Sequence, residues 1–167
     1  IAGGSLLALG RGDTIDGRMP LSVSRDLGAT WEFRASPFPP ISGGQRLALI
    51  RLREGPLFFA SFAAAVEVPG LDGEPIVGSG LFAALSEDDG ETWRVARFIT
   101  DGSGRALETT DGAPFTLSET EAEPRGYLTA IQDSGGTIHL LSSRQHYRFN
   151  LAWLTERLSA SAALHGE

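Results

Sequence analysis

Short runs rich in hydrophobic residues that favour β-strands recur along the whole chain, and Gly, Pro or Asp bounds each run. Runs such as LFFASF at Leu57–Phe62 and IHLLS at Ile138–Ser142 are typical of β-strands. The strands predicted in this way are Ser5–Leu9, Met19–Ser24, Trp31–Ala35, Leu47–Leu52, Leu57–Phe62, Leu81–Ser86, Trp93–Ile99, Tyr127–Ile131, Ile138–Ser142 and Phe149–Leu154. The pattern predicts an all-β protein, and 21 Gly and 9 Pro residues indicate many turns.

An eight-residue pattern occurs twice, as SRDLGATW at Ser24–Trp31 and as SEDDGETW at Ser86–Trp93. Both copies match Ser-x-Asp-x-Gly-x-Thr-Trp. If the predicted strands are grouped into four-stranded units, both copies lie between the third and fourth strands of a unit. The Asp can accept backbone N–H groups in a tight turn, the Gly supplies a positive φ, and the Trp can pack on the neighbouring unit. We assign structural roles to Ser24, Asp26, Gly28, Thr30, Trp31, Ser86, Asp88, Gly90, Thr92 and Trp93. A partial match at Asp133–Thr137 lacks Ser and Trp, and we interpret it as a hairpin turn.

The predicted strands form units that follow one another along the chain. We place these units at roughly 1–36, 37–100 and 123–155, followed by a tail at 156–167, within a single domain 1–167. Antiparallel four-stranded units in series, none of which covers its own faces, are the signature of a β-propeller. The chain is therefore predicted to hold about three blades.

The phase of the units sorts the loops onto two faces of the expected disc. The first-to-second hairpins and the repeated turns share one face. The opposite face carries the longer loops Gly10–Arg18, Pro37–Arg46, Val66–Gly78, Thr100–Arg125 and Ser142–Arg148. Because functional residues favour long loops on a rigid scaffold, we expect the site on this long-loop face.

Arginine and acidic side chains concentrate on the long-loop face. All 14 basic residues of the chain are arginine, which grips carboxylates at two points better than lysine does. A GC-rich genome would give the same composition. Candidate substrate-binding residues are Arg11, Arg18, Arg46, Arg125, Arg144 and His146, and Asp13 and Asp16 are candidate acid/base residues. Convergent Arg, carboxylate and Tyr groups suit an anionic sugar, so the expected partner is an acidic carbohydrate or glycan.

The overall composition argues against several classes of function. The net charge of −7 argues against nucleic acid, which needs a basic face. No apolar run approaches the ~20 residues that span a bilayer, and the given chain shows no signal segment. The absence of cysteine excludes disulfides and thiolate sites, and no metal or cofactor motif occurs, so we expect neither. Many exported bacterial proteins also lack cysteine, and we expect a secreted or periplasmic location.

The repeated pattern resembles the Asp-box, or BNR repeat, of the sialidase-like (neuraminidase) β-propeller superfamily. The resemblance implies a six-bladed ring, of which this chain would hold about half. The stretch from Glu123 to Arg144 also resembles the sialidase segment in which Glu-Pro precedes a first strand and an Arg closes the second. This resemblance implies that Glu123 acts as base on a nucleophilic tyrosine and that Arg144 helps to grip the substrate carboxylate.

Tyr147 is the only tyrosine on the long-loop face, because the sequence predicts Tyr127 inside a strand. We take Tyr147 as the candidate nucleophile, although its place three residues after Arg144 differs from that of the family's tyrosine. The resemblance implies a tyrosine because the anomeric carbon of sialic acid bears a carboxylate, which repels an anionic attacker. The family's Arg-Ile-Pro segment is absent from this chain.

Two functions follow from these predictions. The first is a sialidase-type glycoside hydrolase, or exo-α-sialidase, that cleaves terminal sialic acid or a related acidic sugar. The alternative is a non-catalytic BNR-repeat propeller that binds glycan or protein on the same face. About three blades leave open sheet faces, so further blades or self-association of the chain would be needed to close the ring.

Overall fold

The computed structural model describes residues 4–70, 72 and 74–164, and these residues form mainly β-strands. The strands are β1 (Leu6–Leu9), β2 (Pro20–Ser24), β3 (Glu32–Ala35), β4 (Ala48–Arg51), β5 (Leu57–Pro69), β6 (Pro75–Ser86), β7 (Arg94–Phe98), β8 (Arg105–Glu108), β9 (Pro114–Leu117), β10 (Thr129–Gln132), β11 (Ile138–Leu141) and β12 (His146–Phe149). One helix follows, α1 (Leu151–Leu164). The prediction of a mostly β protein is confirmed.

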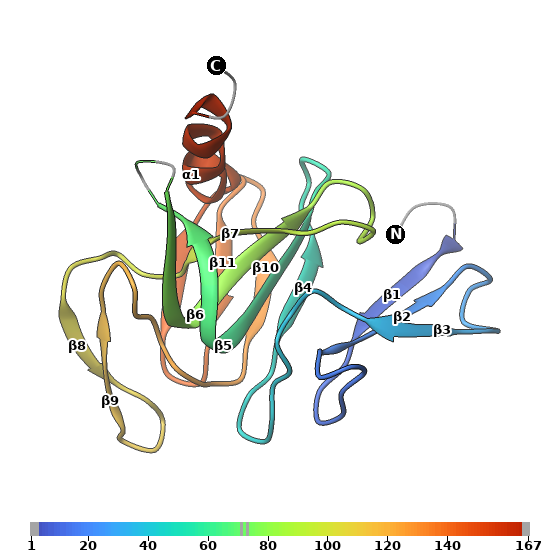
Figure 1. Cartoon of the computed structure of the whole chain (residues 1–167), viewed down its shortest axis with the longest axis horizontal. Helices are drawn as coiled ribbons and strands as arrows, with labels where there is room; N and C mark the ends of the chain where they lie inside the picture. The colour runs from blue at the N-terminus through green and yellow to red at the C-terminus, as the bar shows by residue number, and fades with distance from the viewer. Residues whose placement is uncertain (1–3, 71, 73, 165–167) are drawn as a thin grey trace.

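The strands form four antiparallel sheets in which neighbouring strands follow the order of the chain. Two sheets, β1–β2–β3 and β10–β11–β12, have three strands; β4–β5–β6–β7 has four, and β8 and β9 form a separate hairpin. Figure 1 shows the four-stranded sheet in the middle, with β1–β3 on one side and the β8–β9 hairpin on the other. Within the described ranges no sheet closes on itself.

Aromatic side chains of the central sheet and the loop before it form the middle of the core. Phe59 stacks on Phe38 with ring centroids 4.1 Å apart, and Trp93 packs against both rings at 5.8 and 5.3 Å. Phe82 packs edge-on against Phe59 at 6.1 Å. The second copy of the repeated pattern is therefore anchored in the core through its Trp, whereas Trp31 of the first copy is 38% exposed.

A parallel contact places the start of β10 beside the start of β4. Arg46 pairs with Tyr127 in parallel orientation. The Arg46 N–H donates to the Gly126 carbonyl at 3.0 Å, and the Arg46 carbonyl accepts the Leu128 N–H at 3.1 Å. This contact joins two segments that are far apart in the sequence and positions both for the site described below.

A second parallel contact holds the chain before β10 against β6. Ser79 pairs with Glu121, and Gly78 lies beside Thr120. Any side chain at Gly78 would overlap the Thr120 backbone, so this close approach requires glycine. The segment that leads to Glu123 is thus fixed by the central sheet.

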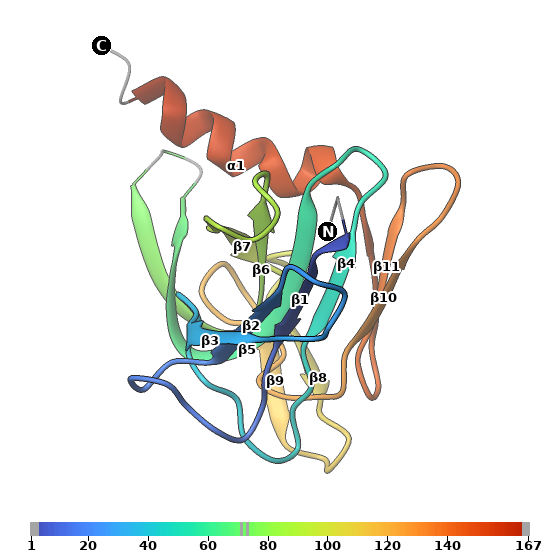
Figure 2. The same cartoon turned by 90° about the vertical axis from the view of Figure 1, so that its right-hand side faces the viewer.

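The C-terminal segment forms a helix, so the predicted strand Phe149–Leu154 is wrong for residues 151–154, and the predicted tail is helical from residue 156 to residue 164. Asn150 caps the helix, because its Oδ1 accepts the Trp153 N–H at 2.9 Å. Alternation over so few residues cannot separate a strand from a helix start, and the Asn cap decides the outcome. In Figures 1 and 2, α1 lies across one end of the central sheet, where it contacts β5 and β7. In the part of the chain that the structure describes, no helix has the length and apolar character needed to cross a membrane.

Three predicted long loops contain strands. β5 and β6 extend through most of Val66–Gly78 as a long hairpin, Thr100–Arg125 holds the β8–β9 hairpin, and Ser142–Arg148 holds the start of β12. β8, β9 and β12 have four residues each, so even the buried pair Phe115 and Leu117 of β9 gives an alternating pattern too short to stand out in the sequence. The loops at Gly10–Arg18 and Pro37–Arg46 carry no strand.

Candidate functional site

The first copy of the repeated pattern forms a closed hydrogen-bonded turn. Asp26 Oδ1 accepts the Thr30 N–H at 2.8 Å, and Asp26 Oδ2 accepts the Thr30 hydroxyl at 2.6 Å. The Ser24 hydroxyl donates to Asp26 Oδ1 at 2.8 Å and accepts the Gly28 N–H at 2.7 Å. These bonds, led by that from the Thr30 hydroxyl, lower the pKa of Asp26 to about 2. The carboxylate is thus occupied within the turn, as predicted.

The second copy repeats this geometry. Asp88 accepts the N–H and the hydroxyl of Thr92 at 2.8 and 2.5 Å, and the hydroxyl is the main cause that lowers the pKa of Asp88 to about 2. In both copies the Trp indole N–H donates to the Gly carbonyl at 3.1 Å. Gly28 and Gly90 have φ of 94° and 90°, which confirms the predicted positive φ.

A cluster of three side chains, of which only Glu123 is fully buried, lies at the β10–β12 sheet. Glu123 precedes β10 and is 0% exposed, Ser142 follows β11, and Tyr147 is part of β12. The Ser142 hydroxyl donates to Glu123 Oε1 at 2.8 Å, and the Tyr147 hydroxyl donates to Glu123 Oε2 at 2.9 Å. Gly126 lies over the carboxylate, since a Cβ at Gly126 would be 3.4 Å from Glu123 Oε1. Each carboxylate oxygen therefore has one hydroxyl donor.

Burial changes the proton affinity of both acidic groups in this cluster. It raises the pKa of Glu123, and the hydrogen bonds from Ser142 and Tyr147 oppose that shift. The pKa of Tyr147 lies well above its ordinary value, first because of burial and then because of the negative charge of Glu123. A desolvated carboxylate is a stronger base than an exposed one, and the 2.9 Å contact gives the Tyr147 proton a direct route to it.

A hollow of about 270 Å³ has Tyr127, Arg125 and Asp111 in its wall, and we call it the Tyr127 hollow. Tyr127 is 47% exposed, and the guanidinium carbons of Arg46 and Arg11 lie 5.5 and 5.9 Å from the centre of its ring. Arg125 lines the hollow and pairs with Asp111. The remaining lining residues are Gly44, Thr109, Thr110, Gly126 and Ser143. The positive charges of Arg11 and Arg46 on the Tyr127 ring can attract an anionic group to this hollow. Asp111 in its wall offsets the charge of Arg125.

Hydrogen bonds from side chains to backbone carbonyls connect the predicted loops at the Tyr127 hollow. Arg11 Nη1 donates to the Gln45 carbonyl at 2.9 Å, and Gln45 Nε2 donates to the Pro124 carbonyl at 3.2 Å. Three of the predicted long loops thus meet here and bring Arg11, Arg46 and Arg125 to one place.

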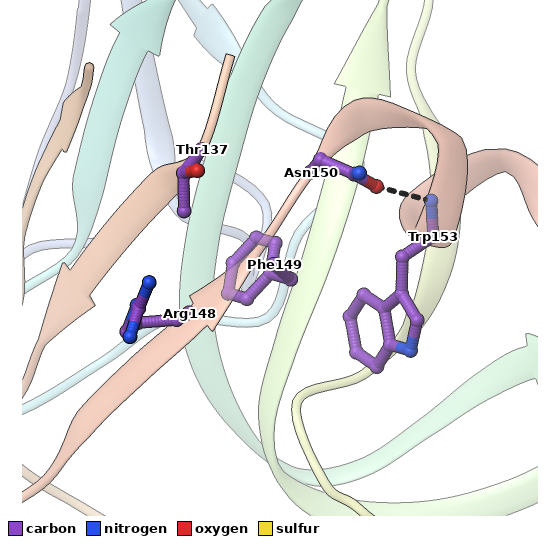
Figure 3. A pocket seen from close by; sticks show the side chains of 5 residues that line it. All are labelled: Thr137, Arg148, Phe149, Asn150 and Trp153. Carbon is purple, nitrogen blue, oxygen red and sulfur yellow. Dashed lines mark hydrogen bonds between the residues drawn. The ribbon is translucent and has the colours of Figure 1, made fainter. Parts of the chain in front are cut away.

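A second hollow, of about 250 Å³, is lined by Tyr147, and we call it the Tyr147 hollow. Its other lining residues are Ile99, Thr100, Asp101, His146, Arg148, Phe149 and Trp153. It adjoins a hollow of about 400 Å³ that shares Arg148, Phe149 and Trp153, shown in Figure 3 beside the start of α1. Glu123 lies next to a wall residue of each hollow. It accepts a hydrogen bond from Tyr147 of the Tyr147 hollow, and it lies close to Gly126 of the Tyr127 hollow.

Arg144 and Arg18 are held by neighbouring loops. Arg144 Nη1 donates to Glu108 Oε2 at 3.3 Å and to the carbonyl of Thr109, a residue of the Tyr127 hollow, at 3.1 Å. Arg18 Nη1 donates to the Pro37 carbonyl at 3.3 Å. Arg144 therefore borders the Tyr127 hollow, whereas Arg18 braces the loop after β3.

Asp13 and Asp16 are exposed in the β1–β2 connection and line neither the Tyr127 hollow nor the Tyr147 hollow. Asp16 has a φ of 51° in a tight turn.

The two histidines of the β11–β12 hairpin contact each other. His146 Nε2 lies 3.0 Å from His139 Nδ1, and His139 Nε2 lies 3.3 Å from Asp133 Oδ2. Within residues 4–70, 72 and 74–164, no three His, Cys, Asp or Glu side chains converge to hold a metal ion.

Asp133 forms a hairpin turn, as the partial match to the repeated pattern predicts. Its Oδ1 accepts the N–H groups of Gly135 and Thr137 at 2.8 and 2.9 Å. The turn joins β10 to β11. The prediction of a plain turn at this position is confirmed.

Four residues of these sites are missed by the sequence reasoning: Tyr127, Ser142, Asp101 and Arg148. The sequence predicts Tyr127 inside a strand, but β10 begins at Thr129 and leaves Tyr127 at the hollow. Two successive serines directly after a hydrophobic run are a turn signal that would point to Ser142. Asp101 and Arg148 lie in predicted long loops, and no feature of the sequence distinguishes them from the other charged residues there.

The structure brings two groups of predicted residues together: Glu123 with Tyr147, and Arg11 and Arg46 with Arg125. No family model matches the sequence, and a search of curated proteins finds no match. A function for this chain can therefore be proposed only from the contact of Glu123 with Tyr147 and from the arginines near Tyr127.

Proposed function

We propose that this chain forms part of a sialidase-like β-propeller, with β1–β3, β4–β7 and β10–β12 as parts of consecutive blades. The repeated turn has the same place in the first two of these sheets, between β2 and β3 and between β6 and β7. Glu91 of the second turn pairs with Arg25 and Arg34 of the first sheet at 3.5 and 3.0 Å. The parallel contact of Arg46 with Tyr127 supports adjacent inner strands, which run parallel in a propeller.

Within this fold, we infer that the chain acts as a sialidase-type glycoside hydrolase on terminal sialic acid or a related acidic sugar. The observation that carries the inference is the 2.9 Å hydrogen bond from the Tyr147 hydroxyl to Glu123 Oε2. The resemblance of the Glu123–Arg144 segment requires a tyrosine that passes its proton to Glu123. The chain has two tyrosines, and the other, Tyr127, is exposed between arginines.

The proposed reaction begins when Tyr147 Oη attacks the anomeric carbon and its proton moves to Glu123 Oε2. A bond forms between Tyr147 and the sugar, the glycosidic C–O bond breaks, and the leaving oxygen takes a proton from a carboxylic acid. Candidates for that acid are the loop residues Asp13 and Asp16. Asp101 lines the Tyr147 hollow, but hydrogen bonds from Ser103 lower its pKa, which disfavours the protonated form that an acid needs. Water then attacks the anomeric carbon, gives its proton to the same carboxylate, and Tyr147 leaves with the proton held by Glu123.

The complete burial of Glu123 fits this chemistry, because the base acts through Tyr147 and never touches the sugar. Tyr147 itself is only partly buried and lines a hollow. Tyr147 attacks the carbon that bears the substrate carboxylate, so a guanidinium group of the same hollow would hold this carboxylate, and Arg148 lines that hollow. Binding at Arg11, Arg46 and Arg125 would instead fit a non-catalytic function.

A second function, non-catalytic binding of an acidic glycan, is favoured by one observation. Tyr147 packs against the hydrophobic core, and its pKa is raised rather than lowered. In a binding protein the cluster of Glu123, Ser142 and Tyr147 would serve only to hold the β10–β12 sheet together. The Tyr127 hollow would then be the binding site.

Turnover of a fluorogenic sialoside by the full chain separates these two functions. A hydrolase releases the fluorophore, and Glu123→Gln should lower kcat/KM by about 10²-fold or more, because general-base catalysis contributes 10²–10⁴-fold. Glu121→Gln is the matched control, since Glu121 is exposed and lies two residues upstream. Saturable binding of the glycan without turnover, unchanged in Glu123→Gln, would refute the hydrolase and support the binding protein. Equal loss in both variants would show that no specific base is involved.

The variants Arg46→Ala and Arg148→Ala identify the hollow that takes the substrate carboxylate. If the Tyr147 hollow binds it, as attack by Tyr147 requires, Arg148→Ala raises KM and Arg46→Ala does not; the reverse result assigns the Tyr127 hollow and contradicts attack by Tyr147. Loss of one charge-assisted contact corresponds to about a tenfold change or more in KM. An unchanged KM in both variants would contradict the assignment of an acidic sugar.

A further inference from the structure

The Ser142 hydroxyl connects the buried carboxylate to the turn between β11 and β12. It donates to Glu123 Oε1 at 2.8 Å, and its oxygen accepts the N–H groups of Arg144 and Gln145 at 3.3 and 3.1 Å. The Ser142 N–H donates to the Gln145 carbonyl at 2.9 Å and closes the turn. One serine therefore takes part in four hydrogen bonds that hold a single turn and a single carboxylate.

The two backbone donors fix the direction of the hydroxyl proton. A hydroxyl has one O–H donor and two acceptor positions, and the N–H groups of Arg144 and Gln145 fill both acceptor positions. The O–H must then point at Glu123 Oε1, which stays an acceptor. The other oxygen, Glu123 Oε2, is the one that the Tyr147 hydroxyl contacts, so a proton from Tyr147 reaches Oε2 directly.

We propose that Ser142 is a positioning residue that holds the Glu123 carboxylate so that Oε2 takes the proton of Tyr147. As a statement about catalysis this rests on the proposed hydrolase function. As a statement about the carboxylate it depends only on the contacts of Ser142, and it can be tested in the absence of any substrate. The charges of Asp101 and Arg105 also act on Tyr147, and they are the same in every variant below.

Removing the Ser142 donor should raise the pKa of Glu123 above its value in the wild-type chain. The ionised carboxylate would lose one of its two donors in a buried place, while the neutral carboxyl would lose less. A hydrogen bond to a charged group corresponds to about one to two pH units. Ser142→Thr keeps the hydroxyl and should keep the titration, Ser142→Cys keeps the volume with a weak donor and should shift it, and Ser142→Ala should shift it most.

The experiment is a ¹³C NMR titration of the chain labelled at the glutamate side-chain carboxyl carbon, with the Glu123 signal assigned by its loss in Glu123→Gln. Ser143→Ala is the matched control for this readout, because the Ser143 hydroxyl accepts the Tyr127 N–H and has no bond to Glu123. A titration of Glu123 that is unchanged in both Ser142→Cys and Ser142→Ala would overturn the proposal. The cysteine variant keeps the test valid if the alanine variant does not fold.

A measurement of sialoside turnover then distinguishes the proposed hydrolase function from the role of Ser142 in holding Glu123. If the wild-type chain turns over a sialoside, Ser142→Ala should lower kcat more than it changes KM and move the acidic limb of the pH profile upward, and Ser142→Thr should restore both. If the titration shifts as expected but no sialoside is turned over, the hydrolase proposal fails and the role of Ser142 in fixing Glu123 stands. If kcat falls equally in Ser142→Thr and Ser142→Ala, Ser142 has only a structural role.

Discussion

The substitution Gly90→Ala tests whether the second repeated turn joins two sheets. Gly90 has a φ of 90°, and a Cβ at this position would lie less than 3.0 Å from Leu7 Cδ1 of β1. Gly28 has the same place in the first copy with a φ of 94°, but a Cβ there would meet Leu6 Cδ1 at 3.5 Å, an ordinary contact. The two substitutions share the backbone effect and differ in the clash between sheets.

The magnitude follows from adding these two effects for each variant. A left-handed backbone costs an L-residue about 1–2 kcal/mol, so we expect Gly28→Ala to lower the free energy of unfolding by that amount. Overpacking costs a further 1–3 kcal/mol or so in general, and Leu7 is half-buried with a terminal methyl that can shift, so the lower part of this range applies. We expect Gly90→Ala to be about 1–2 kcal/mol more destabilising than Gly28→Ala.

Urea unfolding of the three chains, followed by tryptophan fluorescence, measures this difference. Gly12→Ala is a further control, because Gly12 has a φ of 96° and open space around the position of a Cβ. In the background Leu7→Ala the extra loss caused by Gly90→Ala should disappear, since the clashing methyl is gone. Equal losses for Gly28→Ala and Gly90→Ala, or no coupling between residues 7 and 90, would show that the turn does not join the sheets.

Two more predictions concern Glu123 and the helix cap. Because burial raises the pKa of folded Glu123 above its unfolded value, the proton-linked stability is fully present below pH 4.5 and is lost as the pH rises through the folded pKa. Wild-type stability minus that of Glu123→Gln should therefore fall as the pH rises from 4 to 7 in urea unfolding, and a flat difference would contradict the raised pKa. Asn150→Ala removes the acceptor of the Trp153 N–H and should lower the free energy of unfolding by about 1 kcal/mol, whereas Asn150→Asp should retain most of it. A loss of the same size in both variants would exclude capping as its cause.

Local patterns predict much of this fold because their determinants lie within a few residues of one another. The turn of Asp26 uses donors at most four residues away, so its hydrogen bonds can be derived from the sequence. The sequence predicts the fully buried parts of β5 and β6, Leu57–Phe62 and Leu81–Ser86, but not the rest of their long hairpin, which is mostly exposed or half-buried. The β8–β9 hairpin has strands of only four residues, and only β9 buries side chains, Phe115 and Leu117, so the sequence resembles a loop there. Helix α1 depends on a single cap at Asn150, and the short run before it fits a strand equally well.

The candidate site is predicted only in part because it depends on contacts between distant segments. The family resemblance singles out Glu123, but its proton donor lies 24 residues away, and only the register of β11 with β12 brings Tyr147 to it. Tyr127 joins the arginines through its parallel contact with Arg46, and a contact across 81 positions leaves no local pattern in the sequence. Charge and residue type identify the arginines of the site, whereas the position of each arginine requires the fold.

The direction of the pKa shifts separates two kinds of carboxyl group in this chain. The pKa of Asp26 and that of Asp88 are lowered because exposed turns surround each carboxylate with donors, and such ionised groups do not take up protons at neutral pH. The pKa of Glu123 is raised because the group is buried with only two hydroxyl donors. A scaffold has no need of this arrangement, since an apolar residue of similar volume would hold the sheet without a desolvated acid. The proposed proton transfer would use this arrangement, because the desolvated carboxylate is the stronger base and its Oε2 accepts the Tyr147 hydroxyl at 2.9 Å.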